Sequence, residues 1–164
     1  REDTYLEFMV KIYMDHEGVT NKLSEINAGG ELILHEVFGA IKYKGPGVFL
    51  AGGSGITPFI AIFRDLYKNN LLDGNRLIYS NKTSEDIIME EELQLMFRSN
   101  YVRLLTRENV MGFIGHKIDR EFLIENIADF SQHFYVCGTT DFVESISKYL
   151  LDLGVTPESL VVEK

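Results

Sequence analysis

The chain has 164 residues, of which 45% are hydrophobic and 25% are charged, a composition typical of an ordinary globular protein of one domain or slightly more. Sixteen basic against 25 acidic residues give a net charge of −9, which argues against a nucleic-acid partner because phosphate backbones attract clustered Lys and Arg. The single cysteine excludes a disulfide or multi-cysteine metal site within the chain, and it fits a reducing compartment such as the cytoplasm. No apolar run approaches the ~20 residues that a membrane span needs.

The first 45 residues predict strands around one short helix. Apolar and polar side chains alternate from Leu6 to Ile12, which is the two-residue period of a half-buried strand. A turn-rich stretch then leads to a helical pattern over Val19–Ile26, and Glu31–Val37 is a second strand candidate behind a pair of glycines.

After Gly45–Gly47 the pattern changes to short apolar runs, each followed by a longer helical period. Repeated βα units of this kind predict an α/β fold, with a parallel five-stranded sheet covered by helices on both faces. The five strands are expected at Val48–Ala51, Arg76–Ser80, Val102–Thr106, His133–Cys137 and Ser159–Val162. The predicted domains are therefore residues 1–45 and 46–164.

Four helices are expected between these strands. Their apolar faces are Phe59, Ile62, Phe63 and Leu66; Leu93, Met96 and Phe97; Phe122, Leu123 and Ile127; and Phe142, Ile146, Leu150 and Leu153, ending at Gly154.

A glycine-rich segment, Gly52–Phe59, connects the first parallel strand to the first helix behind it. Glycines let the backbone turn sharply and approach a ligand, Thr57 can cap the helix, and Pro58 suits its first position. The N–H groups of a helix start, together with its dipole, favour a pyrophosphate. The spacing is not the common G-x-G-x-x-G, so a turn without a ligand is the competing interpretation at this stage.

Four segments together resemble the ferredoxin reductase family, whose members move electrons between a nicotinamide and a flavin. Ala51–Pro58 resembles its G-G-x-G-I-T-P signature, and Tyr135–Gly138 resembles its strand ending in Cys-Gly. Gly18–Leu23 resembles its flavin-phosphate helix, and Ser80–Ile87 resembles the stretch after the second strand of NADH-dependent cytochrome reductases. The likeness extends from Leu6 to Leu160 in the family's order.

The resemblance implies FAD and a nicotinamide dinucleotide as cofactors. It places Cys137 in the wall of the nicotinamide pocket, where it attacks nothing, and it assigns Thr57 and Cys137 to the catalytic centre. Phe38–Gly39 resembles a structural element in which Val37 replaces the family's proline. The residues implied to bind the cofactors are Gly18, Val19, Thr20, Asn21, Gly52, Gly53, Ser54, Gly55, Ile56, Thr57, Pro58, Asn81, Lys82, Cys137, Gly138 and Asp141.

Two features depart from the family or leave a choice open. Thr139–Phe142 stands where the family has prolines and a methionine, so Thr140 or Asp141 is expected to cap the next helix. At the ribose end a 2′-phosphate favours basic residues and a free 2′-hydroxyl favours an acidic one. Lys82, with Arg107 near it, favours the 2′-phosphate of NADPH. The likeness of Ser80–Ile87 to the NADH-dependent reductases favours the free hydroxyl of NADH, and we expect NADH by a slight preference.

The sequence offers no support for metal or hydrolytic chemistry. The histidines lack metal-ligand spacing and no nucleophile has an adjacent base; they are His16, His35, His116 and His133. The acidic run Glu90–Glu92 is expected to begin a helix, where the dipole favours it.

The predicted function is a flavin-dependent oxidoreductase that passes hydride from NAD(P)H to FAD. Its partner is expected to be ferredoxin, flavodoxin or a fused redox domain, as the resemblance implies. The family's R-x-Y-S/T flavin motif has no match, and residues 1–45 supply too few strands for a flavin barrel, so they are expected to be the carboxyl part of one. A non-catalytic nucleotide-binding or interaction module of the same fold is the alternative.

Overall fold

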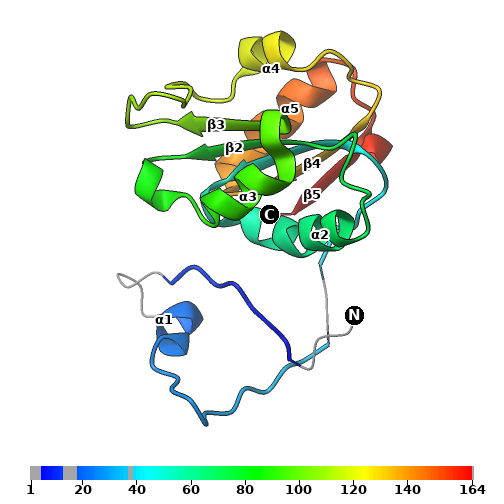
Figure 1. The fold of residues 1–164 in the computed structure, drawn as a ribbon. Coiled ribbons are helices and arrows are strands. Elements are labelled where there is room, and N and C mark those ends of the chain that lie inside the picture. The colour runs from blue at the N-terminus through cyan, green and yellow to red at the C-terminus, as the bar shows by residue number, and fades with distance from the viewer. Residues whose placement is uncertain (1–4, 13–17, 37–38, 164) are drawn as a thin grey trace. The chain divides into compact units, whose positions relative to one another are not determined.

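The computed structural model describes residues 5–12, 18–36 and 39–163, and the chain separates into two compact units. Unit 1 is Arg1–Phe38 and unit 2 is Gly39–Lys164 (Figure 1). The division falls a few residues before the boundary expected from the glycine-rich stretch at Gly45–Gly47.

The described residues of unit 1 contain one short helix, α1 (Val19–Leu23), which ends three residues before the predicted end. The strands predicted over 6–12 and 31–37 are wrong for their described residues, which form no strand, while Val37 lies outside the described part. The alternating apolar side chains are exposed, with exposed fractions of 73% for Leu6 and 60% for Phe8. A two-residue period stabilises a strand only where a neighbouring strand and a core accept it.

Unit 2 confirms the predicted five-stranded parallel sheet, in the order β3-β2-β1-β4-β5. The strands are β1 (Gly47–Gly52), β2 (Arg76–Asn81), β3 (Tyr101–Leu105), β4 (His133–Cys137) and β5 (Leu160–Glu163). Each lies within one residue of its predicted start, because each run contains a short apolar stretch that the sheet buries wholly or in part.

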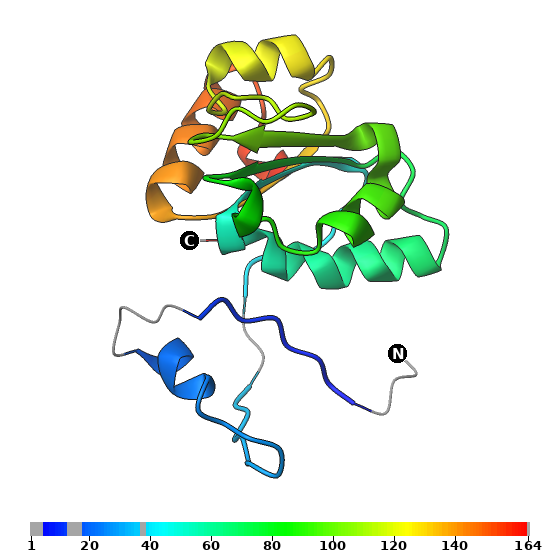
Figure 2. The ribbon, with the colours of Figure 1, turned by 60° about the vertical axis from the view of Figure 1, so that its left-hand side comes forward.

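Helices cover both faces of the sheet, as predicted (Figures 1 and 2). The α-helices are α2 (Thr57–Lys68), α3 (Glu90–Phe97), α4 (Arg120–Asn126) and α5 (Thr140–Asp152). Short 3-10 helices are η1 (Gly53–Ile56), η2 (Ser84–Asp86), η3 (Arg98–Asn100) and η4 (Pro157–Ser159). In the described ranges no helix is long and apolar enough to span a membrane.

The two faces have different cores. On one face, Phe122 of α4 and Ile146 of α5 pack with Leu50 and Val136 of the sheet. On the other, aromatic rings meet edge to face, with Phe49 of β1 at 4.8 Å from the ring centre of Phe63 in α2.

Some helix positions differ from those expected. Val143, and not Phe142, belongs to the buried stripe of α5, while Ile62 in α2 and Leu153 beyond the end of α5 are only half-buried.

The segment that precedes β1 lies against the aromatic face. Phe49 and Tyr135 stack on each other at 4.2 Å, and the Tyr43 ring packs beside both, at centroid distances of 6.4 and 5.9 Å. The Tyr135 hydroxyl accepts from the N–H groups of Lys44 (2.9 Å) and Gly45 (3.1 Å) and donates to the Gly45 carbonyl (2.7 Å). These contacts fix the start of β1 at the amino edge of the sheet.

The strand order places a reversal point between β1 and β4. From β1 the chain moves outward through β2 and β3, and it returns to the other side of β1 with β4 and β5. In open α/β sheets, the carboxyl ends of the strands on the two sides of such a point form the crevice where ligands bind. Here those ends are Gly52 and Cys137.

Candidate functional site

The glycine turn forms the start of a helix at the carboxyl end of β1. Gly53 has a φ of 53°, a conformation that favours glycine, and a Cβ built on it would have no atom within 4 Å. η1 runs directly into α2, and Pro58 lies in the first turn as predicted. The backbone N–H groups at the start of this continuous helix have no intrahelical acceptors and suit an anionic ligand.

Thr57 does not cap α2, contrary to expectation. Thr57 is the first residue of α2 and has helical dihedral angles, and its hydroxyl donates to the Ser54 carbonyl at 3.0 Å. A capping side chain would need extended backbone at its own position, which the preceding 3-10 turn removes. Thr57 therefore tightens the turn from within.

The glycine turn lies directly against the end of β4. A Cβ on Gly55 would lie 2.2 Å from the carbonyl oxygen of Cys137 and 2.6 Å from the nitrogen of Gly138. Only a residue without a side chain permits this approach of two backbones. The contact brings the two predicted motifs, far apart in the sequence, to one crevice.

The Phe142 ring packs against two glycines at the strand ends, Gly52 and Gly138. A Cβ on Gly138 would lie 2.7 Å from its ring, and a Cβ on Gly52 would lie 3.0 Å from it. The ring therefore occupies the space that two glycines leave. The departure from the family's prolines and methionine thus places an aromatic ring under the strand ends.

Thr139, and not Thr140 or Asp141, caps α5. Its hydroxyl accepts from the Phe142 N–H at 3.4 Å, while Asp141 lies exposed in the first turn. The Asp141 carboxylate at this place interacts favourably with the helix dipole, and its role in cofactor binding stays a prediction.

Cys137 ends β4 on the same face as Ala51 of β1 and Glu163 of β5, its register partners. Burial, with a smaller effect of the Glu163 carboxylate, raises the pKa of the Cys137 thiol to about 11. The neutral thiol is then the form present near pH 7, and it is a poor nucleophile. Glu163 was missed in the sequence because only the β4–β5 register brings it beside Cys137.

Asn81 ends β2 with a buried side chain that is 5% exposed. Neither its side-chain oxygen nor its side-chain nitrogen has a hydrogen-bond partner among the described residues. The amide lies close to the Tyr79 hydroxyl and has a small lowering effect on the pKa of Tyr79. The two groups do not have the geometry of a hydrogen bond. A buried amide without partners costs free energy, and a polar ligand at this strand end would remove that cost.

The loops after β2 and β3 run side by side. The N–H of Arg107 donates to the Lys82 carbonyl at 2.9 Å, which confirms that these two residues are neighbours. The N–H and hydroxyl of Ser84 both donate to one oxygen of Glu108 at 2.8 Å. The loops thus hold the Glu108 carboxylate at Ser84, two residues after Lys82, and Glu108 was missed because the sequence showed no pairing between the two loops.

The residues predicted to hold the flavin phosphates belong to unit 1. Gly18 precedes α1 in an extended conformation, and Val19, Thr20 and Asn21 form its first turn. No side chain caps this helix, so the Thr20 hydroxyl is not used in that way.

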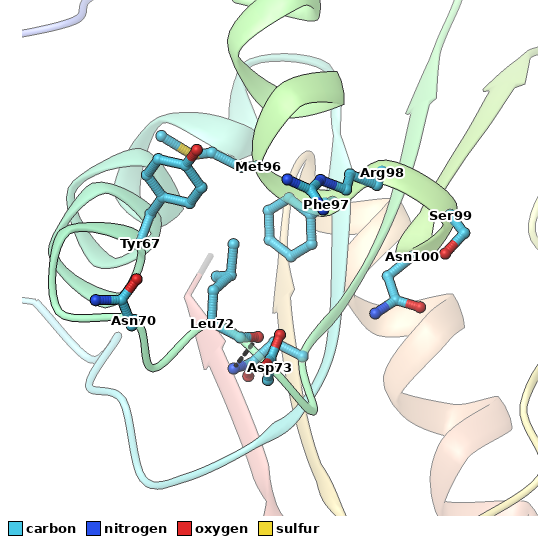
Figure 3. A pocket seen from close by; sticks show the side chains of 10 residues that line it. Tyr67, Asn70, Leu72, Asp73, Met96, Phe97, Arg98, Ser99 and Asn100 are labelled. Atoms are coloured by element: carbon cyan, nitrogen blue, oxygen red, sulfur yellow. Dashed lines mark hydrogen bonds between the residues drawn. The ribbon is translucent and has the colours of Figure 1, made fainter.

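A hollow of about 490 Å³ lies at the amino edge of the sheet and contains none of the predicted site residues (Figure 3). Leu72 and Asp73 from the stretch before β2 and Arg98 and Asn100 from the stretch before β3 are among its lining residues. Within the described ranges no group of three or more metal-binding side chains occurs, and His16 lies outside those ranges.

Comparison with known proteins places this geometry in context. A family profile described as the oxidoreductase NAD-binding domain matches residues 49–148. NADH–cytochrome b5 reductase 1 of Arabidopsis thaliana is 36% identical over 168 residues, covering 93% of this chain and 58% of that protein. NADH oxidoreductase HCR of Escherichia coli is 28% identical over 158 residues, covering 93% and 48%.

Solved structures with the same fold include the cytochrome b5 reductase domain of Ulva prolifera nitrate reductase. It matches 94% of this chain with a TM-score of 0.80 at 19% identity, over 70% of its own length. The flavohaem-like FAD/NAD-binding domain of Vibrio cholerae nitric oxide dioxygenase matches 79% of this chain with a TM-score of 0.68 at 23% identity, over 54% of its own length. The chain spans about half the length of the first curated relatives that it matches.

Proposed function

Because this chain belongs to the oxidoreductase NAD-binding domain family, we propose that it is the nicotinamide-nucleotide part of a flavin-dependent reductase. The observation that carries the proposal is the backbone contact of Gly55 with Cys137 and Gly138. It unites a helix start suited to a pyrophosphate with a strand end suited to the nicotinamide, at the reversal point of the sheet.

The residues of the crevice fit a dinucleotide by their chemistry. The start of η1 and α2 offers backbone N–H groups to the diphosphate, and Gly53 leaves the approach open. The unpartnered Asn81 amide at the next strand end can both donate to and accept from ribose hydroxyls. Cys137, small and neutral, forms a wall against which a flat ring can lie.

Hydride transfer between a nicotinamide and a flavin is chemistry that the two cofactors supply when bound. The chain's own contribution is to hold the nicotinamide in place and to exclude water, since correct placement of the reacting groups supplies most of the rate gain. Thr57 tightens the turn, and Cys137 and Phe142 set the shape of the nicotinamide end. No side chain has to act as an acid or base.

Glu108 supports the slight preference for NADH. Its carboxylate is held by Ser84 in the loop that contains Lys82, and a carboxylate accepts from a free 2′-hydroxyl but repels a 2′-phosphate. Lys82 is exposed, and it would contribute more to a phosphate than to a hydroxyl. NADH is therefore the proposed hydride donor.

FAD is the proposed second cofactor, and an electron-accepting protein or fused redox domain is the proposed partner. The solved relative from Vibrio cholerae is named as an FAD/NAD-binding domain, and the curated relatives reported above are named for NADH and cytochrome b5. The proposed class of acceptor includes ferredoxin and flavodoxin. Gly18–Asn21 is proposed to face the flavin diphosphate, on the strength of the resemblance to the family's flavin-phosphate helix.

The test is anaerobic mixing of the full-length protein with FAD and then with NADH or NADPH, followed by absorbance of the flavin. We expect bleaching, faster with NADH, and no bleaching with NAD⁺. Nucleotide binding without bleaching would instead identify a non-catalytic module of the same fold.

A Cys137→Ala variant separates binding from hydride transfer. Loss of the wall should slow flavin bleaching by about tenfold, because misplacement of the ring is costly to the rate, while binding of ADP-ribose stays unchanged. Equal bleaching rates in the two proteins would remove Cys137 from the catalytic centre.

A further inference from the structure

Tyr79 lies in the middle of the sheet, yet its hydroxyl reaches the glycine turn. The side chain is 1% exposed and points to the face that carries Ala51 and Cys137, since Ala51 is the register partner of both Tyr79 and Cys137. Its hydroxyl donates to the carbonyl of Gly53 at 3.0 Å and accepts from the N–H of Ile88 at 3.4 Å. One hydroxyl thus joins the turn after β1 to the segment that precedes α3.

The peptide between Gly53 and Ser54 lies in η1, and the Tyr79 hydroxyl adds a bond to its carbonyl. Gly53 has a φ of 53° and nothing packs where a side chain would stand, so side-chain packing at Gly53 adds nothing to the restraint on this peptide. In a trans peptide the C=O and the following N–H point in opposite directions. A Gly53 carbonyl held toward the sheet therefore turns the Ser54 N–H away from the sheet.

We infer that Tyr79 is a positioning residue that presents the Ser54 N–H to the diphosphate of the nucleotide. The inference rests on the proposed function and adds a residue that acts on the ligand only through the turn. Burial raises the pKa of Tyr79 to about 12, so the hydroxyl keeps its proton and remains a donor over the whole physiological range.

The test compares Tyr79→Phe with Tyr101→Phe in the full chain. Tyr101 is a matched control, because it lies on neighbouring β3, is 7% exposed, and loses one hydroxyl bond, to Glu90 at 2.8 Å, that does not touch the turn. Binding of ADP-ribose is measured by calorimetry. Binding of adenosine, which lacks any phosphate, is measured by competition against ADP-ribose.

We expect Tyr79→Phe to weaken ADP-ribose binding by about five- to tenfold, the usual effect of one hydrogen bond, with adenosine binding unchanged. Tyr101→Phe should change neither. Thermal unfolding should show both variants folded, since the rings stay in place.

Unchanged ADP-ribose binding in Tyr79→Phe, or an equal loss for adenosine, would overturn the inference while the proposed function stands. An equal effect of Tyr101→Phe would also overturn it, because the loss would then reflect general packing. Absence of ADP-ribose binding in the unchanged protein would overturn the proposed nucleotide site together with the inference.

Discussion

Asn75 and Asn81 stand at opposite ends of β2, and both are buried, with exposed fractions of 1% and 5%. Asn75, just before the strand, accepts from the Gly47 N–H at 3.2 Å, donates to the Leu72 carbonyl at 3.0 Å and meets the Tyr43 hydroxyl. Asn81, at the strand's end, has no such partner among the described residues.

The contrast extends to groups near these two asparagines, while the buried Nδ1 of His133, at the amino end of β4, also has no hydrogen-bond partner among the described residues. At the amino edge, Tyr135, Lys44 and Gly45 satisfy one another's polar groups and hold the chain in place. At the carboxyl edge, Gly53 is open and Asn81 lacks partners. Polar groups that bind within the protein stabilise the fold, whereas buried groups kept without partners suit a ligand. The substitutions below test whether the two edges differ in this way.

The largest effect is expected for Gly55→Ala at the carboxyl edge. The new Cβ would meet backbone atoms of Cys137 and Gly138, which cannot move aside as a side chain would, so about 3 kcal/mol of unfolding free energy and nucleotide binding should both be lost. Gly47→Ala at the amino edge, blocked by the His133 carbonyl at 2.1 Å, should be equally destabilising. Urea unfolding measures both.

Because both variants are destabilised, the two edges are distinguished by whether the folded protein of each variant still binds ADP-ribose. Folded Gly47→Ala protein should bind ADP-ribose normally in calorimetry, and folded Gly55→Ala protein should not. Gly53→Ala is a milder control, because it has room for the methyl group and pays only about 1 kcal/mol for its left-handed backbone. Normal binding by Gly55→Ala would contradict the assigned crevice.

The two asparagines should respond to alanine in opposite ways. Asn75→Ala removes the acceptor of the Gly47 N–H and one of the two donors to the Leu72 carbonyl, so it should cost about 3 kcal/mol in urea unfolding, with nucleotide affinity unchanged. Asn81→Ala removes an amide that already lacks partners, so stability should stay the same or rise, while ADP-ribose binding weakens by about tenfold. Equal destabilisation by the two changes would show that Asn81 is structural.

Tyr135→Phe should have a smaller effect, confined to the amino edge. It removes the hydroxyl that bonds the Lys44 and Gly45 backbone, and the unfolding free energy should fall by about 1 to 2 kcal/mol. ADP-ribose affinity, measured on the same samples, should not change. A change in affinity would mean that the two edges are coupled.

The smallest effect concerns the protonation of Cys137. Its pKa is raised to about 11 from an ordinary value of 9.0, so the folded protein favours the protonated thiol. That contribution to stability is complete below pH 9 and is lost as pH rises toward 11. Alkylation of the native protein by iodoacetamide should therefore be slow at pH 8 and should accelerate about tenfold per pH unit up to that range. A fast reaction with an inflection below pH 9 would show an activated thiolate.

The strands and helices of unit 2 followed from the sequence because their patterns are local. Runs such as His133–Cys137 are buried on both faces and read as strands whatever their neighbours are. Leu6–Ile12 has an equally regular period but no strand forms there, because a half-buried strand depends on a partner that the local pattern does not specify. The glycine turn and the Cys-Gly strand end were also recognisable from the sequence, because each is a motif of a few consecutive residues.

The tertiary structure decided which segments that are distant in the chain come into contact. The sequence by itself determined the alternating strands and helices that are typical of a parallel α/β fold, the glycine turn and Cys137 at a strand end, since each of these patterns is local. The approach of Gly55 to Cys137, the hydroxyl of Tyr79 beneath Gly53, and Glu163 beside Cys137 depend on strand order and register. Parallel strands pair only after long crossovers, and which side chains then meet is settled by packing of the whole sheet.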